Sequence, residues 1–304
     1  MPDLPVALRV PIMDALARSG DTTPLQRVRS IGGGCINNAL RLDTAQLSYL
    51  LKWHSNPPQH IFTTEMLGLQ LLASVGTVRV PDVIAFSEVT EQYPGFLLME
   101  WIEPARRSSR HGNEALLGEQ LAMLHKQGAS PHYPPAYGLD HNNYIGTTPQ
   151  INSWETNWVT FFRDYRLRPQ IVLAEHNNYL SILQRRNLDR LLVRLDELLG
   201  GVERQPALLH GDLWSGNVIA GPQGEPVLID PAVYYGDREA ELAYTELFGG
   251  FGRAFYEAYE ATWPTAPDRA LRRDVYNLYH LLNHLNLFGT MYSVSIDQVL
   301  SRYV

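Results

Sequence analysis

The 304-residue sequence contains very little of the residue types that mark several special classes of protein. Cys35 is its single cysteine, which excludes a disulfide framework or a cysteine-rich zinc site and suits the reducing cytosol. No run of roughly 18 apolar residues occurs, so we expect no membrane-spanning helix. The first residues also lack a basic segment followed by an apolar one, so no secretory signal is predicted. These absences indicate a cytoplasmic protein.

An excess of positive charge is missing as well. The chain has 25 Lys and Arg against 32 Asp and Glu, a formal net charge of −7. Binding to nucleic acid requires a basic face that neutralises phosphates, so we expect no nucleic-acid partner. What the chain does have is 45% hydrophobic residues, enough to bury a sizeable core, which excludes a disordered or fibrous protein. Its length corresponds to roughly two domains of average size.

The first hundred residues are predicted to be strand-rich and the rest mostly helical. Apolar patterns predict strands over residues 26–31, 39–43, 47–54, 83–86 and 96–102, with one helix among them that ends near Gly76. Further helices are predicted over residues 114–127, 154–168, 180–199 and from 239 onward, and a loop over 130–150. We therefore place a boundary near residue 103, between a sheet-rich lobe (1–103) and a larger helical lobe (104–304).

The segment HGDLWSGN carries most of the chemical information. Asp212 and Asn217 lie in its loop between two short apolar runs, and Asp230 ends a third apolar run. Because the residues between the last two runs have the composition of a turn, we expect a hairpin in which Val218 faces Ile229. Asn217 and Asp230 then meet at the open end of the hairpin, beside Asp212.

These three side chains match the needs of phosphoryl transfer. An amide oxygen and a carboxylate are hard oxygen ligands, which suit Mg²⁺ bound to a phosphate chain. The carboxylate of Asp212 can orient a hydroxyl group and accept its proton. A single aspartate in a loop is more often a turn residue. Three groups in this order are instead typical of a kinase catalytic loop followed by its metal-binding aspartate.

A kinase also needs a cation that binds the ATP phosphates and an anion that anchors this cation. Lys52 lies on the predicted third strand, on the face opposite Leu51, and Glu65 lies beside the inward face of the helix that follows. A pair between Lys52 and Glu65 is therefore geometrically allowed. Taken alone, each residue is more typical of a solvated surface, and their order before Asp212 is what favours the pair.

Two further stretches of the sheet-rich lobe fit a nucleotide site. A glycine triplet at residues 32–34 lets backbone N–H groups approach phosphates, although such triplets also form plain hairpin turns. The surrounding pattern is neither a P-loop nor a Rossmann motif. The strand over 97–102 runs into the lobe boundary, where its backbone either pairs with an adenine edge or is simply buried. The candidate ATP-binding residues are Gly32, Gly33, Gly34, Lys52, Glu65, Glu100, Trp101 and Ile102.

On these motifs the chain resembles the fructosamine kinase (ketosamine 3-kinase) family, which is related to aminoglycoside and choline kinases. The general signal is the HGD motif with the asparagine and the aspartate that follow it. The narrower signal is Trp214, because aminoglycoside kinases usually carry histidine there. Two longer blocks, within residues 143–170 and 229–251, also resemble this family.

The resemblance implies an α+β, protein-kinase-like fold of two lobes: a small N-terminal antiparallel β-sheet lobe plus one helix, and a larger, mostly helical C-terminal lobe. It implies that ATP and Mg²⁺ are used to phosphorylate the 3-hydroxyl of ketosamines, the ribulosamine and fructosamine adducts of glycated amines, which leads to deglycation. Asp212 is then the catalytic base, Asn217 and Asp230 bind Mg²⁺, and Trp214 lines the site of a small or protein-bound ketosamine.

Two other functions stay open at this point. A kinase for another hydroxylated amine, such as an aminoglycoside or choline, would use the same catalytic residues and usually needs an acidic substrate pocket. A nucleotide-binding pseudokinase would keep the fold and act as a sensor or partner module without turnover. The sequence does not indicate the oligomeric state or the preferred sugar.

The chain departs from protein kinases at two positions and adds one reactive group. Asp230-Pro231-Ala232 replaces Asp-Phe-Gly, and Gly211 replaces the arginine of His-Arg-Asp, so control by activation-loop phosphorylation is not expected. Cys35 lies inside the glycine loop, where neighbouring N–H groups favour a thiolate. We predict that oxidation of Cys35, or an intermolecular disulfide, lowers activity reversibly.

Other polar residues are predicted to be structural. The ten histidines show no zinc-type spacing. We expect His125 to pack within its helix and His210 to hydrogen-bond the backbone of the catalytic loop. Arg272 and Arg273 are predicted to lie on a solvated helix face, and the aromatic residues of 154–165 to pack in the core.

Overall fold

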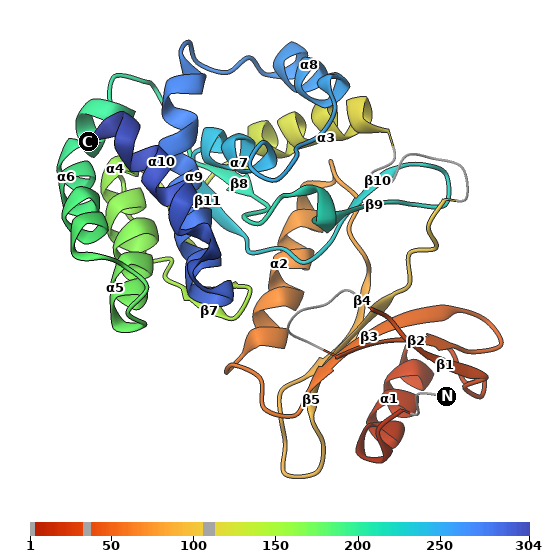
Figure 1. The fold of residues 1–304 in the computed structure, drawn as a ribbon. Helices are drawn as coiled ribbons and strands as arrows, with labels where there is room; N and C mark the ends of the chain where they lie inside the picture. Colours follow the sequence, from red (N-terminus) through yellow and green to blue (C-terminus); the bar gives the residue numbers. More distant parts are fainter. Residues whose placement is uncertain (1–3, 33–37, 106–112) are drawn as a thin grey trace.

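The first part of the chain forms an antiparallel sheet (Figure 1). The computed structural model describes residues 4–32, 38–105 and 113–304. The sheet has five strands in the order β1-β2-β3-β5-β4. They are β1 Arg27–Ser30, β2 Asn38–Asp43, β3 Ser48–His54, β4 Val83–Ser87 and β5 Gly95–Glu100. β5, the strand that leads into the helical part, therefore lies inside the sheet and pairs with β3.

Two helices cover opposite faces of this sheet. Side chains alternate between the faces of a strand. On β3, Leu51 packs with α1 (Val6–Arg18), whereas Lys52 points toward α2 (Ile61–Val75). α2 is the predicted helix. α1 is a second helix in addition to the single one predicted, and Pro11 inside it explains why the sequence pattern did not reveal it.

The second part of the chain is mostly helical, which confirms the α+β fold class. The helix predicted over 154–168 instead begins at Trp158 and continues through a π-helical turn to His176. None of the helices in the described ranges is long and apolar enough to cross a lipid bilayer. The helical elements are α3 Glu114–Gln127, α4 Trp158–Phe161, the π-helical turn Phe162–Leu167, α5 Arg168–His176, α6 Ile182–Leu199, α7 Arg238–Thr245, α8 Arg253–Thr262, α9 Arg269–Phe288 and α10 Ser293–Tyr303.

One apolar cluster joins the two parts of the molecule. It contains Phe62 and Leu69 of α2 together with Leu121 of α3, Leu208 and Phe255. Figure 1 shows α2 between the sheet and the helical lobe, where this cluster fixes it. Each fully buried Leu or Phe side chain contributes about 1.5–3 kcal/mol relative to exposure. The helix that carries Glu65 is therefore held by both lobes.

Three short two-stranded ladders support the loops of the helical lobe. They are β6 Asn143–Ile145 with β7 Thr148–Gln150, β8 Ala207–Leu209 with β11 Tyr234–Gly236, and β9 Val218–Ala220 with β10 Pro226–Leu228. The first of these lies in the region predicted as loop. In the third, Val218 pairs with Leu228, so the predicted pairing with Ile229 was wrong by one residue. The cause is a turn of five residues, 221–225, between the paired Ala220 and Pro226, in which the Gly221 N–H donates to the carbonyl oxygen of Glu225 at 2.7 Å.

Candidate active site

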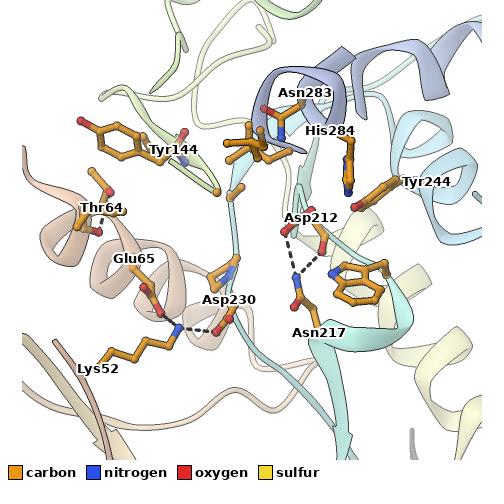
Figure 2. Close-up of a pocket in the computed structure, with 18 of the residues that line it drawn as sticks. Lys52, Thr64, Glu65, Tyr144, Asp212, Asn217, Asp230, Tyr244, Asn283 and His284 are labelled. Atoms are coloured by element: carbon orange, nitrogen blue, oxygen red, sulfur yellow. Dashed lines mark hydrogen bonds and ion pairs between the residues drawn. The ribbon is translucent and has the colours of Figure 1, made fainter. Parts of the chain in front are cut away.

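A pocket of about 270 Å³ lies between the two lobes and brings six of the predicted site residues together, Trp214 among them. Lys52 and Glu65 line it from β3 and α2, and Asp212 and Asn217 line it from the loop between β8 and β9. Asp230, after β10, completes this group. Figure 2 shows Lys52 and Asp212 on opposite sides of the pocket, with Asp230 between them.

The Asp212 carboxylate lies in this pocket and is held by an amide. The Asn217 Nδ2 donates to the carbonyl oxygen of Asp212 at 2.8 Å and to its carboxylate Oδ2 at 3.1 Å. Burial raises the pKa of Asp212 to about 7, and hydrogen bonds from Tyr244 and Asn217 only partly oppose this rise. A carboxylate with a pKa near neutrality suits a general base.

Lys52 connects three elements through two ion pairs. Its Nζ lies 2.6 Å from Glu65 Oε1 and 2.5 Å from Asp230 Oδ1. Although burial favours the neutral amine, these two carboxylates raise the pKa of Lys52 above its ordinary value, so it stays charged. Asp230 has a φ of 56°, a left-handed conformation that is uncommon for a non-glycine residue and often marks a functional position.

A buried carboxylate that sequence reasoning missed, Glu241 of α7, orders the start of the loop that carries Asp212. It accepts hydrogen bonds from the backbone N–H groups of His210 at 3.1 Å and Gly211 at 2.7 Å. His125 of α3 lies 2.8 Å from the same carboxylate through Nε2 and 2.8 Å from Tyr259 through Nδ1. Although burial opposes ionisation, the bond to His125 holds the pKa of Glu241 below its ordinary value. Because both ring nitrogens of His125 have partners inside the protein, its role is structural.

His210 and Gly211 fix the loop by their own geometry. His210 Nε2 lies 2.9 Å from the carbonyl oxygen of Ile229, and its Nδ1 accepts from the Asp212 N–H at 3.3 Å. The ring is therefore structural. Gly211 has a φ of 83°, and a Cβ there would overlap the carbonyl oxygen of Ala232. Only glycine combines this positive φ with the absence of a Cβ.

The wall of the pocket beyond Asp212 is formed by uncharged and aromatic side chains. Trp214, with an exposed fraction of 38%, lies over Gly216, where a Cβ would overlap the indole. The other members were not predicted as site residues, because they come from elements that are distant in the sequence. They are Tyr144 of β6, Tyr244 of α7, and Asn283, His284, Leu287 and Phe288 of α9.

Of the remaining ATP-binding candidates, those that the structure describes do not line this pocket. Gly32 is exposed after β1, whereas Gly33, Gly34 and Cys35 fall outside the described residues. Glu100, Trp101 and Ile102 follow one another at the end of β5, and none of the three lines the pocket. The Glu100 carboxylate lies 2.7 Å from Arg79, and the Trp101 N–H donates to the carbonyl oxygen of Ser48 at 3.2 Å. Ile102 is buried.

Comparison with known proteins agrees with this geometry. The family model described as fructosamine kinase matches residues 12–304. The chain is 39% identical to the probable ketoamine kinase of Synechocystis sp. over 286 residues, 93% of this chain and 92% of that one. It is 36% identical to the chloroplastic protein-ribulosamine 3-kinase of Arabidopsis thaliana over 294 residues, 97% and 87% of the two chains.

Solved structures show the same fold. The structure of a candidate fructosamine-3-kinase from Thermobifida fusca superimposes with a TM-score of 0.82, at 29% identity and 98% coverage of both chains. The aminoglycoside phosphotransferase APH(4)-Ia gives a TM-score of 0.65 at 14% identity, covering 98% of this chain and 99% of that one, which shows the shared protein-kinase-like fold. The two-lobe fold and the sequence match lead to one conclusion: the chain belongs to the fructosamine kinase family.

Proposed function

We propose that this protein is a phosphotransferase that moves the γ-phosphoryl group of ATP to the 3-hydroxyl of a ketosamine, the adduct of a sugar with an amine. The observation that carries the proposal is Asp212, a half-buried carboxylate in the pocket between the lobes, facing Lys52 across Asp230. The relatives named as ketoamine kinase and protein-ribulosamine 3-kinase supply the class of acceptor.

In this reaction the chain positions a hydroxyl and removes its proton. The acceptor hydroxyl lies against Asp212, whose carboxylate accepts the proton as the hydroxyl oxygen forms its bond to the γ-phosphorus. The bond between that phosphorus and the bridging oxygen breaks, and ADP leaves with the electron pair. The pKa of about 7 keeps Asp212 ionised in a substantial fraction of molecules at neutral pH while leaving it basic enough to act.

The sheet side of the pocket would receive the nucleotide. Lys52, anchored by Glu65, would exchange its contact with Asp230 for phosphate oxygens, and the glycines at 32–34 would supply backbone N–H groups. The end of β5, at residues 100–102, would hold the adenine. The lobe boundary near residue 103 then coincides with the nucleotide site.

Mg²⁺ fits the residues on the other side of the phosphates. Asn217 uses its Nδ2 for Asp212, which leaves its amide oxygen as a ligand, and Asp230 adds a carboxylate. Within the described residues no cluster of three or more His, Cys, Asp or Glu could hold a metal by itself. Two protein ligands suit Mg²⁺, which usually completes its shell with water and phosphate oxygens. When bound, the ion neutralises charge on the β- and γ-phosphates.

The alternatives fit the pocket less well. Its acidic lining residues are Glu65, Asp212 and Asp230, which in the proposed reaction anchor Lys52, accept the proton and bind Mg²⁺. The acceptor wall carries no carboxylate. A polycationic aminoglycoside would find no anionic partners there. A pseudokinase would not need the base, the metal-binding pair and the lysine together.

A coupled ADP-release assay on a substrate panel tests the proposal. The panel contains a ribulosamine, a fructosamine, an aminoglycoside and choline, with the Asp212→Asn variant as the control. We expect Mg²⁺-dependent ADP release with the two ketosamines and its loss in the variant. Turnover of the aminoglycoside or choline in preference to both ketosamines would overturn the assigned acceptor. No turnover of any kind that depends on Asp212 would overturn the kinase itself.

A further inference from the structure

The α9 wall of the pocket carries two polar side chains that the proposed chemistry does not use. Asn283 and His284 are consecutive residues near the end of α9, and both line the pocket that holds Asp212. Figure 2 shows both side chains directed from α9 into the pocket. Asn283 is only 2% exposed, so its polar atoms need partners. Which atom each side chain presents to the pocket decides what it can bind.

A chain of amides fixes the orientation of Asn283. Asn286 Nδ2 donates to the backbone oxygen of Gln170 at 2.9 Å and to Gln170 Oε1 at 2.8 Å. A backbone carbonyl only accepts, so this Asn286 atom is a nitrogen and the Gln170 atom facing it is an oxygen. The other end of Gln170, Nε2, donates to Asn283 Oδ1 at 3.3 Å. Asn283 Nδ2 has no partner in the described part of the chain, so Asn283 presents a donor.

A second backbone carbonyl fixes the tautomer of His284. Its Nδ1 lies 2.8 Å from the carbonyl oxygen of His280, which can only accept, so Nδ1 carries the hydrogen. Burial lowers the pKa of His284, which keeps the ring neutral and leaves a lone pair on Nε2. No described residue donates to Nε2. The rings packed around His284 are those of Tyr244, Phe248, Phe288 and Tyr292.

A donor beside an acceptor selects one kind of ligand. An ammonium group only donates and a phosphate oxygen only accepts, whereas a hydroxyl group does both. We propose that Asn283 and His284 bind hydroxyl groups of the acceptor sugar other than the one that reacts, and so determine which sugars are phosphorylated. Asn283 Nδ2 donates to a hydroxyl oxygen, and His284 Nε2 accepts a hydroxyl hydrogen. This assignment rests on the proposed kinase function, because it places the acceptor against Asp212.

The test combines variants with substrates that lack one hydroxyl. The variants are Asn283→Ala, His284→Leu and His284→Gln, with Leu271→Ala as the control at an exposed position of the same helix. The substrates are a ribulosamine and its analogues, each without one hydroxyl other than the 3-hydroxyl. For every combination, kcat, the acceptor KM and the ATP KM are measured, together with the melting temperature.

We expect Asn283→Ala and His284→Leu to raise the acceptor KM at least about tenfold, because each leaves a hydroxyl without its partner. The ATP KM stays within about twofold of wild type. With wild-type enzyme, the analogue that lacks the bound hydroxyl also shows an acceptor KM raised about tenfold. With the variant of the residue that binds this hydroxyl, the same analogue shows no further rise in KM. His284→Gln recovers part of the affinity, since its amide oxygen can accept. Leu271→Ala behaves as wild type.

The inference would be overturned if, for every analogue, the rise in acceptor KM from the variant multiplied with the rise from the missing hydroxyl. Such a result would show that the side chains and the hydroxyls act independently. A raised ATP KM with an unchanged acceptor KM would overturn it as well. If Asn283→Ala does not fold, Asn283→Ser and the His284 pair decide the question. Failure of the kinase proposal is distinct, because wild-type enzyme would then turn over no ketosamine at all.

Discussion

The two sides of the pocket differ in charge. On the sheet side, Lys52 lies between two carboxylates, those of Glu65 and Asp230. On the helical side, the proposed acceptor wall of Trp214 and the α9 residues carries no charged side chain, and its polar groups are amide, imidazole and indole. Ion pairs can be exchanged for the charges of phosphates, whereas a neutral wall avoids the cost of desolvating charges against an uncharged polyol. In the proposed reaction, each side thus suits one of the two substrates.

Replacing Asp212, where the two sides meet, should have the largest effect on turnover. Asp212→Asn keeps the shape and can still contact Asn217, but it cannot accept a proton. We expect kcat to fall about 10²–10⁴-fold, the usual contribution of a general base. ATP binding measured by calorimetry should stay close to wild type. A variant that retained more than a tenth of wild-type kcat would show that Asp212 is not the base.

On the charged side, Lys52→Met should weaken both catalysis and the fold. It removes the cation for the phosphates and leaves Glu65 buried and unpaired. We expect kcat/KM for ATP to fall at least about 10²-fold, and the free energy of unfolding by about 3–5 kcal/mol. The double variant Lys52→Met with Glu65→Leu should recover most of the stability and none of the activity. Recovery of activity in the double variant would contradict the assignment.

Glu241→Gln should weaken the hydrogen bonds that hold the start of the loop carrying Asp212. The amide brings an N–H₂ group against the N–H groups of His210 and Gly211, which removes at least one hydrogen bond. We expect the free energy of unfolding to fall by about 1–3 kcal/mol and kcat to fall about tenfold, with KM values nearly unchanged. Glu119→Gln on the exposed face of α3 is the matched control. Equal unfolding curves for the two variants would show that Glu241 does not hold the loop.

The pH dependence should follow Asp212. Its pKa of about 7 means that kcat/KM rises about tenfold per pH unit below 7 and then levels off. Stability runs the opposite way. The folded pKa lies above the unfolded value of 3.8, so stability falls as pH rises from about 4 to about 7. The melting temperature of Asp212→Asn, relative to wild type, should therefore be higher at pH 8 than at pH 5. An equal difference at both values would refute the raised pKa.

On the neutral wall, Trp214→Ala should have the smallest effect. The indole offers an apolar face to the sugar but carries no charge. We expect the acceptor KM to rise about five- to tenfold, with the ATP KM unchanged. Trp214→Phe should restore most of the affinity. A larger effect on the ATP KM than on the acceptor KM would place Trp214 on the nucleotide side instead.

The parts of the molecule that follow local patterns could be predicted from the sequence. Period-2 alternation along 47–54 placed Lys52 on the face opposite Leu51, which α2 covers, and helical spacing placed Glu65 on that helix. Those periods allow a contact between these two residues, and the structure contains it. The register of the β9–β10 hairpin could not be predicted in this way. It depends on whether the turn holds four or five residues, and turn composition does not decide this.

What depends on long-range packing could not be predicted. Asn283 and His284 reach Asp212 only because α9 packs beside α7, and no motif marks them. The prediction for Arg272 was wrong for a related reason. Its side chain is buried and makes two hydrogen bonds, at 2.7 and 2.9 Å, with Glu239 of α7. A charged residue on a helix is solvated only if nothing packs against that face.

Gly211 also bears on how this enzyme can be controlled. The arginine that protein kinases carry at this position holds a phosphorylated loop and so links catalysis to a signal. Here any side chain would overlap the carbonyl oxygen of Ala232, so the position is closed to arginine. The catalytic loop takes its shape from Glu241 and from its own backbone as the chain folds. We therefore expect this loop to be assembled without phosphorylation, so that the rate of deglycation follows the supply of glycated amine and ATP.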